Sequence, residues 1–233
     1  MAIIHDTTMS PGKLELLRDW LPSRPWYLAS GRGPELAKAG GFRLDDPAGE
    51  VGIEFMVVTD GCGPRAITYQ VPLTYRAGEL AGAEGGLIGT AGHGVLGRRW
   101  IYDGTCDPVL VAQLVALVHG GAEPQAQNAS RTPDPTVIAR PVANGPVAVA
   151  TSVVAADGPA GTDLRIQAAG ADGMPDRLLI MRINRILRPG DGAAAAGEAG
   201  QPCLSAAWRL TEGTQVRGVF ATARYLPEQA TRP

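Results

Sequence analysis

Lysine is nearly absent from this sequence: it occurs only at Lys13 and Lys38, so 19 of the 21 basic residues are arginines. The net charge is −2, and aromatic residues make up 5% of the chain. A nearly neutral chain without basic clusters excludes the usual electrostatic signature of a nucleic-acid-binding or membrane-surface protein. The excess of arginine is typical of a GC-rich coding sequence. It argues against an arginine-lined anion site, because only Arg98 and Arg99 are adjacent.

Cysteine is also scarce, and its spacing excludes the common cysteine-based sites. Cys62, Cys106 and Cys203 lie far apart, with no C-x-x-C pair and no histidine at ligand spacing. We therefore expect no metal site, and we interpret the cysteines as buried, reduced thiols of a cytoplasmic protein. The first residues lack the basic and apolar segments of a signal peptide, and no apolar run approaches the ~20 residues that a membrane span requires.

One glycine-rich stretch, GHGVLG at residues 92–97, has the spacing G-x-G-x-x-G of a dinucleotide-binding loop. Such a loop must lead from a strand into a helix, whose first amides hold the pyrophosphate. Here a strand pattern, RRWIYD, follows instead, so the glycines predict a hairpin turn. The chain also lacks a Walker sequence and a G-x-S-x-G nucleophile elbow. We expect no cofactor.

The hydrophobic patterns predict an α+β protein in which strands dominate. Helices are predicted at about residues 11–21, with Ser10 as N-cap and Pro11 as first residue, and at 108–119, which is apolar nearly all round and therefore buried. Turn residues separate consecutive strand patterns without helices between them, which predicts one or more curved antiparallel sheets. The predicted strands cover residues 51–59, 65–76, 97–104, 146–156, 163–169, 177–187, 203–210 and 215–226.

The composition also suggests how the chain is organised. Residues 121–135 are rich in Gly, Pro and small polar side chains, which predicts a linker between residues 1–120 and residues 136–233. The second part is expected to be an antiparallel β region that packs on or continues the first, so a single domain remains an alternative. Residues 189–202 are low in complexity and predict a long loop between strands.

An ordered set of short motifs resembles the N-terminal cap domain of bacterial maltokinases. The motifs are WLPSRPWY at residues 20–27, VPLTYR at 71–76, GLIGT at 86–90 and LGRRWIYDG with DPVLVAQL at 96–114. The resemblance extends over about residues 1–120 and implies a role near maltose, trehalose or α-glucan metabolism. Maltokinases also carry a phosphotransferase lobe with an H-G-D-x-x-x-x-N loop, which this sequence lacks. Kinase activity is therefore not expected, because phosphoryl transfer needs a positioned metal and a catalytic aspartate.

The candidate binding residues come from these motifs, and two interpretations of them are open. Their aromatic side chains can pack the first helix onto the sheet, or they can form a sugar- or partner-binding surface in which arginines supply planar donors. Residues 98–103 alternate between two faces of a strand, and we predict that one face is buried. The candidates are Arg24, Trp26, Tyr27, Arg98, Arg99, Trp100, Tyr102 and Asp103, and no catalytic residue is proposed.

Two functions follow from these observations. The first is a non-catalytic, cap-like protein that binds a protein partner, such as a kinase or a glucan-metabolising enzyme. The second is a protein or enzyme that binds a small molecule, a sugar or a sugar phosphate, on the concave face of the sheet. Nucleic acid and membrane are not expected as partners. A homo-oligomer is a further possibility, since antiparallel sheets have edges that must be covered.

Overall fold

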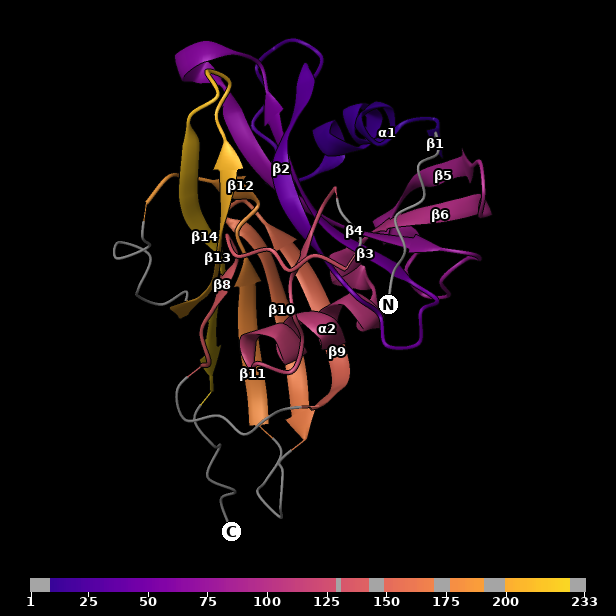
Figure 1. Cartoon of the computed structure of the whole chain (residues 1–233), viewed down its shortest axis with the longest axis vertical. Coiled ribbons are helices and arrows are strands. Elements are labelled where there is room, and N and C mark those ends of the chain that lie inside the picture. Colours follow the sequence, from indigo (N-terminus) through magenta and orange to yellow (C-terminus); the bar gives the residue numbers. More distant parts are fainter. Residues whose placement is uncertain (1–8, 129–130, 143–148, 170–176, 191–199, 227–233) are drawn as a thin grey trace.

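The computed structural model describes residues 9–128, 131–142, 149–169, 177–190 and 200–226, and Figure 1 shows their arrangement. The first elements along the chain are β1 (Met9–Ser10), α1 (Lys13–Trp20), β2 (Leu36–Leu44), β3 (Gly52–Asp60), β4 (Ile67–Arg76), β5 (Leu87–His93), β6 (Gly97–Asp103), α2 (Pro108–Val118) and β7 (Gln125–Ala126). They are followed by β8 (Ile138–Ala139), β9 (Val149–Gly158), β10 (Gly161–Ala169), β11 (Arg177–Ile183), β12 (Ile186–Leu187), β13 (Gln201–Arg209) and β14 (Gln215–Tyr225).

All the strand pairs among these residues are antiparallel, and they form one curved, open sheet. The main strand order is β1-β5-β6-β4-β3-β2-β13-β14-β11-β10-β9, with β7, β8 and β12 attached beside it. Strands that follow one another in the sequence mostly pair directly, because short turns connect them. The predicted β-dominant α+β class with two helices is confirmed.

The strand that joins the early and late parts of the sheet was missed by the sequence analysis. β2 pairs with β3 on one side, and on the other its Gly40 lies opposite Trp208 of β13. Glycines weaken a strand pattern, yet here they are needed. Gly41 has a φ of +129°, and a Cβ at this position would lie 2.1 Å from the Phe55 carbonyl oxygen. The register also shifts between Lys38 and Gly40, where β2 carries a bulge.

The start of the first helix differs from the prediction by a few residues. α1 begins at Lys13, and its N-cap is Gly12 rather than Ser10. Ser10 belongs to β1, where it pairs with Gly92 of β5. The Gly12 amide donates a hydrogen bond of 2.7 Å to the carboxylate of Glu15, which satisfies one of the free donors at this helix end. Tertiary pairing at the sheet edge therefore displaced the local capping signal.

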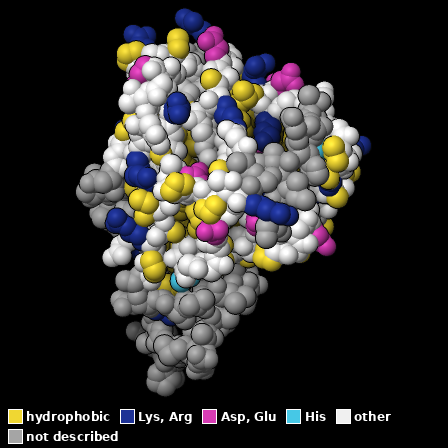
Figure 2. Space-filling model, in the orientation of Figure 1, with side chains coloured by type: hydrophobic (Ala, Val, Ile, Leu, Met, Phe, Trp, Pro, Cys, Tyr) yellow, Lys and Arg dark blue, Asp and Glu magenta, His cyan; other side chains and the backbone are white. Residues whose placement is uncertain are grey.

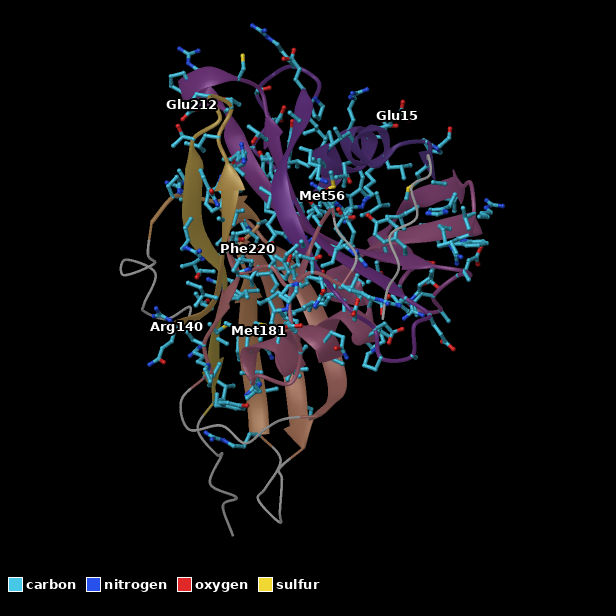
Figure 3. The ribbon with its side chains drawn as sticks, in the orientation of Figure 1. Glu15, Met56, Arg140, Met181, Glu212 and Phe220 are labelled. Atoms are coloured by element: carbon cyan, nitrogen blue, oxygen red, sulfur yellow. The ribbon has the colours of Figure 1, made fainter. Side chains whose placement is uncertain are left out.

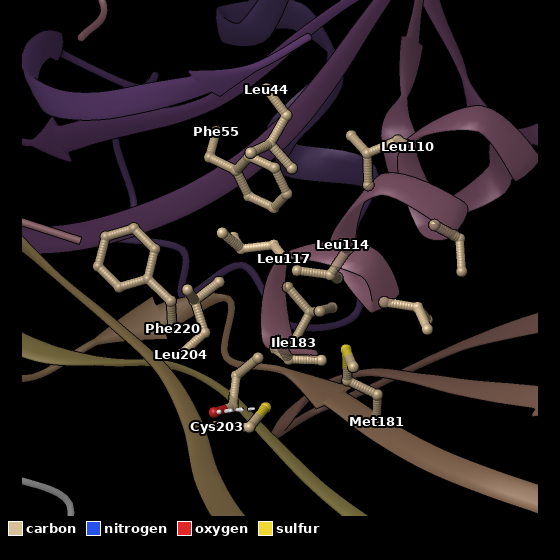
Figure 4. Packing of buried hydrophobic residues seen from close by; sticks show 14 of the residues in the cluster. Leu44, Phe55, Leu110, Leu114, Leu117, Met181, Ile183, Cys203, Leu204 and Phe220 are labelled. Carbon is tan, nitrogen blue, oxygen red and sulfur yellow. Dashed lines mark hydrogen bonds between the residues drawn. The ribbon is translucent and has the colours of Figure 1, made fainter. Parts of the chain in front are cut away.

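Two apolar clusters lie on opposite sides of the first strands. The smaller cluster packs α1 onto β3 and β4 and contains Leu17, Trp20, Met56 and Tyr69. The larger cluster surrounds α2, which packs against residues of β2 and β3 and of β10, β11, β13 and β14 (Figure 4). Met56 belongs to the first cluster, and Met181 and Phe220 belong to the second (Figure 3). The sheet thus curves around a buried α2, as its apolar sequence predicted.

The larger cluster includes side chains from both sides of the predicted linker. Leu44 and Phe55 precede the linker, while Ile183 and Phe220 follow it, and all four are buried in the same cluster. The division of the chain at residues 121–135 stays a prediction. Of the predicted loop at 189–202, residues 191–199 lie outside the described part of the chain.

The cysteines do not share one environment, which corrects the expectation of buried thiols. All three are free thiols, but only Cys203 is buried, while Cys62 and Cys106 are exposed. Burial raises the pKa of the Cys203 thiol to about 12. Cys62 and Cys106 follow strand ends, where the chain leaves the cover of the core.

Candidate functional site

The candidate residues after α1 are held by aromatic packing. Trp26 is fully buried, and its ring centroid lies 5.8 Å from that of Trp20 and 6.0 Å from that of Tyr69. Tyr27 stacks on Tyr69 at 5.6 Å. Such pairs add a modest attraction to the burial of their surface. The interpretation that these rings fasten the first helix to the sheet accounts for their positions.

Trp26 also forms one wall of a buried polar cluster centred on Arg185, which the sequence analysis did not select. Arg185 is fully buried and follows β11. Its Nη2 donates to Asp103 Oδ2 at 2.5 Å and to Thr105 Oγ1 at 3.1 Å, and its Nε donates to Thr162 Oγ1 at 2.7 Å. The guanidinium lies 4.9 Å from the centroid of the Trp26 ring. A buried guanidinium needs such partners, because its charge has lost its water.

A small cavity next to this cluster is lined by Arg24, Cys106 and Asp157, together with Asp103 and Thr162. Its volume of about 80 Å³ holds a few water molecules and is too small for a sugar ring. Within the part of the chain that the structure describes, Nη1 of Arg185 has no hydrogen-bond partner. This cluster therefore joins segments of the fold and leaves little room for a substrate.

Cys106 lies beside the cluster but is poorly suited to act as a nucleophile. Its thiol packs closely enough on Gly86 that a Cβ there would lie 2.8 Å from the sulfur. Although Cys106 as a whole is exposed, partial desolvation of its thiol, followed by the negative charge of Asp103, raises the pKa of Cys106 to about 11. Because the thiolate is the reactive form, Cys106 stays protonated and slow to react near neutral pH.

Two other candidates have structural hydrogen bonds. The Tyr27 hydroxyl donates to Asp60 Oδ2 at 2.8 Å, and burial together with this carboxylate raises the pKa of Tyr27. The Tyr102 hydroxyl accepts a 2.8 Å hydrogen bond from the Leu80 amide, and Tyr102 is buried. Both hydroxyls fix a neighbouring loop to the sheet.

The remaining candidates lie on the β5–β6 hairpin, and their burial differs from the prediction. The hairpin turn spans the glycine motif as predicted, with His93 opposite Gly97. Burial changes along β6 rather than between its faces: Arg98 is exposed, Arg99 and Trp100 are half-buried, and Ile101, Tyr102 and Asp103 are buried. Ile101 lies in the α1 cluster and Tyr102 lies under the Leu80 loop, so both faces are covered at this end. The turn end of the hairpin, which includes the first residues of β6, extends beyond this cover.

The exposed end of the hairpin combines basic and apolar side chains. The Arg98 guanidinium lies 5.1 Å from the Trp100 ring centroid, and Nη2 of Arg98 donates to Thr90 Oγ1 at 3.4 Å. Val95 is 62% exposed and Leu96 is 44% exposed in the turn. A shallow hollow of about 660 Å³ beside them is lined by Ser10, Pro11, Thr90, Ala91, Gly92, His93, Gly94, Gly97 and Arg98. This hollow is open to solvent rather than enclosed.

A second buried charge cluster, centred on Glu54 of β3, was also missed. Lys13 Nζ and the Tyr75 hydroxyl each donate to Glu54 Oε2 at 2.5 Å, and Gln127 Nε2 donates to Oε1 at 2.6 Å. Burial alone raises the pKa of Glu54, but the charge and hydrogen bond of Lys13 lower it below its ordinary value. The charge of Glu54 acts on Lys38 as well, although burial is the larger effect and lowers the pKa of Lys38.

The structure thus brings Trp26 and Asp103 together at Arg185, places Arg24 beside them, and leaves Arg98, Arg99 and Trp100 on the hairpin.

The sequence did contain a signal for Arg185. In RLLIMRINRIL, Arg185 shares a strand face with Leu179, Met181 and Ile183, all of which are buried. An arginine on a buried face requires a charged or polar partner, but the spacing of residues in the sequence does not identify that partner. Basic side chains are dispersed over the face shown in Figure 2.

Fold and site together describe a β-dominant α+β protein whose β5–β6 hairpin exposes apolar side chains at its turn. A sequence model of the maltokinase N-terminal cap domain matches residues 20–107. This segment runs from Trp20 to Asp107, the N-cap of α2, and includes the β5–β6 hairpin. The resemblance to the cap domain is confirmed over these residues. No curated protein matches the sequence.

No group of three or more His, Cys, Asp or Glu side chains in the described part of the chain is placed to hold a metal ion. None of its helices is both long enough and apolar enough to cross a membrane.

Proposed function

We propose that this chain is a non-catalytic, cap-type binding protein that associates with a kinase or another glucan-modifying enzyme in maltose, trehalose or α-glucan metabolism. The pathway is supported by the match of residues 20–107 to the maltokinase cap domain. A cytoplasmic location is part of the proposal and is supported by the three free thiols. The proposed contact surface is the β5–β6 hairpin.

The observation that carries this proposal is the exposure of aliphatic side chains at the hairpin turn. Val95 and Leu96 are among the exposed large hydrophobic residues, and they lie next to the hollow that Arg98 lines. Apolar residues combined with arginine and tryptophan are typical of protein–protein contacts. The matching surface of the partner is apolar with acidic groups at its rim, opposite Arg98 and Arg99.

A variant of the hairpin tests this proposal. The doubly substituted chain Val95→Ser, Leu96→Ser and the wild-type chain are each used for affinity purification from native cells at low salt. Val154→Ser is the matched control, because Val154 is 59% exposed but lies on β9 at the other end of the sheet. The expected result is recovery of a kinase or glucan-modifying enzyme by wild type and by Val154→Ser, and its loss with the hairpin variant. Recovery that does not depend on the hairpin contradicts the proposal.

The non-catalytic part needs a separate measurement. The purified chain is incubated with ATP, Mg²⁺ and maltose, and both ADP and phosphorylated sugar are measured. We expect neither product above the background without protein. Turnover that disappears when one residue of the chain is substituted would instead identify an enzyme.

A second candidate function, binding of a sugar or sugar phosphate, has an observation of its own. A cavity of about 500 Å³, lined by both polar and apolar residues, lies beside α2 and away from the hairpin. This volume is within the range of small-molecule sites.

A further inference from the structure

The cavity beside α2 is built from three separate segments. The β2–β3 loop contributes Asp45 and Asp46, α2 contributes Gln113, and the chain after α2 contributes Glu123 and Gln125. Arg131 completes the polar lining. None of these residues takes part in the Arg185 or Glu54 clusters or in the hairpin surface.

The β2–β3 loop is held rigidly at this cavity. Asp46 is buried, and its carboxylate accepts hydrogen bonds of 2.9–3.0 Å from the amides of Ala48, Glu50 and Val51. Arg131 is the non-glycine residue in the described chain with a positive φ, at 55°. Residues other than glycine rarely adopt a positive φ unless the surrounding structure holds it. The wall formed by the β2–β3 loop is therefore held in place by its own hydrogen bonds.

Gln125 supplies the observation that indicates a ligand. Its side chain lines the cavity and is only 8% exposed. Its Nε2 donates to Glu123 Oε2 at 3.2 Å, which fixes the amide. Its Oε1 is buried and accepts no hydrogen bond from the residues that the structure describes. Buried acceptors in proteins normally have a donor, and a ligand that enters the cavity can supply one to this oxygen.

The charges around the cavity limit what that donor can be. The lining contains three carboxylates, Asp45, Asp46 and Glu123, and one guanidinium, Arg131, a formal balance of −2. A phosphate group would meet net repulsion here. A neutral ligand rich in hydroxyls meets none, since each hydroxyl both donates and accepts hydrogen bonds.

We infer that this cavity binds a neutral sugar or related polyol, with Gln125 Oε1 accepting a hydrogen bond from a ligand hydroxyl, and that it rejects sugar phosphates. This inference rests on the second candidate function and narrows its ligand from sugars in general to unphosphorylated ones. It does not depend on the hairpin or on a protein partner.

Calorimetric titration of the full chain with maltose and, separately, with glucose 1-phosphate tests the inference. We expect saturable maltose binding with a dissociation constant in the millimolar range, and binding of the phosphate ester about tenfold weaker or undetectable. Gln125→Leu should weaken maltose binding about tenfold, because it removes the acceptor at nearly constant size. Gln215→Leu is the matched control, since Gln215 is exposed on β14 and does not line the cavity.

A second variant tests the charge argument. Glu123→Gln removes one carboxylate from an exposed position, so the preference for maltose over glucose 1-phosphate should narrow by several-fold. The unfolding midpoint of each variant is measured first, to show that the fold is retained. Tighter binding of the phosphate ester, no saturable maltose binding, or equal losses in Gln125→Leu and Gln215→Leu would each overturn the inference. Any of these results leaves the partner-binding experiment unaffected.

Discussion

The buried charge clusters centred on Glu54 and on Arg185 have similar chemistry but join different parts of the fold. Glu54 is paired with Lys13, Tyr75 and Gln127, and these residues lie on α1, β4 and the segment after β7. Arg185 instead connects the end of β6 and the turn that follows it to β10 and to the end of β11. The first cluster fastens α1 to β3 and β4, whereas the second fastens the end of residues 20–107 to the later strands.

The clusters also differ in the hydrogen-bond partners of their central residues and in the exposure of their side chains to solvent. Both oxygens of Glu54 have partners, and its main cation, Lys13, keeps 34% of its side chain exposed. Arg185 and Asp103 are almost fully buried, with 0% and 4% of their side chains exposed. Removing one member of a fully buried pair leaves an uncompensated charge, while a partly exposed partner can return to water. The Arg185 pair is therefore the more sensitive of the two.

The largest effect is expected from Arg185→Met. The substitution leaves Asp103 buried without its cation, so the free energy of unfolding should fall by about 3–5 kcal/mol in urea denaturation. Arg182→Met, three residues earlier on β11, is the control, because the Arg182–Asp163 pair has similar distances but side chains that are 32% and 38% exposed. Its cost should be about 0–1 kcal/mol. Equal costs for the two variants would mean that Arg185 does not hold the parts of the fold together.

A smaller loss of stability is expected from Glu54→Gln. The amide keeps the shape of the side chain but loses the ionic part of its bonds to Lys13 and Tyr75. We expect a loss of about 1–3 kcal/mol, measured in the same denaturation experiment. A loss as large as that of Arg185→Met would contradict the ranking of the two clusters.

The Glu54 cluster should also give the protein a measurable acid sensitivity. The pKa of Glu54 is lower in the folded state than its ordinary value of about 4.3. Its ionisation therefore stabilises the fold above that value, and this contribution is lost as the pH falls through the folded pKa. Unfolding free energies of wild type and Glu54→Gln, measured from about pH 6 down to about pH 3, should converge toward low pH. Parallel curves would show that Glu54 is not the group responsible.

The smallest predicted effect concerns the thiol next to Arg185. The positive charge of Arg185 lowers the pKa of Cys106, against the larger effects of burial and Asp103. In Arg185→Met the pKa of Cys106 should therefore rise further, and alkylation of this thiol under native conditions should become slower at a given pH. Cys203, which is buried, serves as the internal standard, since it should react only on unfolding. Peptide mass spectrometry distinguishes the two sites, and faster alkylation of Cys106 without global unfolding would contradict the assignment.

Strong local patterns in the sequence predicted the elements that depend on neighbouring residues. The alternation in RLLIMRINRIL correctly separated buried from partly exposed positions, and the apolar α2 is buried as expected. The glycine motif forms a hairpin turn because its surroundings are strand-like. β2 was missed because Gly40 and Gly41 obscure its pattern, and their close contacts to Trp208 and Phe55 exist only in the assembled sheet.

The candidate site shows even more clearly that local patterns do not predict contacts between distant segments. The motifs identified Trp26 and Asp103 but not Arg185, which is 82 residues from Asp103 along the chain. They likewise gave no indication that Lys13 would meet Glu54, or that Gln125 would line a cavity with Asp45. Charged and amide side chains have no periodic pattern of their own, so their partners are set by long-range packing.

By itself, the sequence determined the class of fold, the position of both helices, most strands and the resemblance to a maltokinase cap, because these depend on the period of apolar residues and on local motifs. Tertiary structure alone decided which charges are buried together, where β2 joins the sheet and where the cavities lie. These features require segments distant in the chain to come within a few ångströms, and only the packing of the helices on the assembled sheet brings them there.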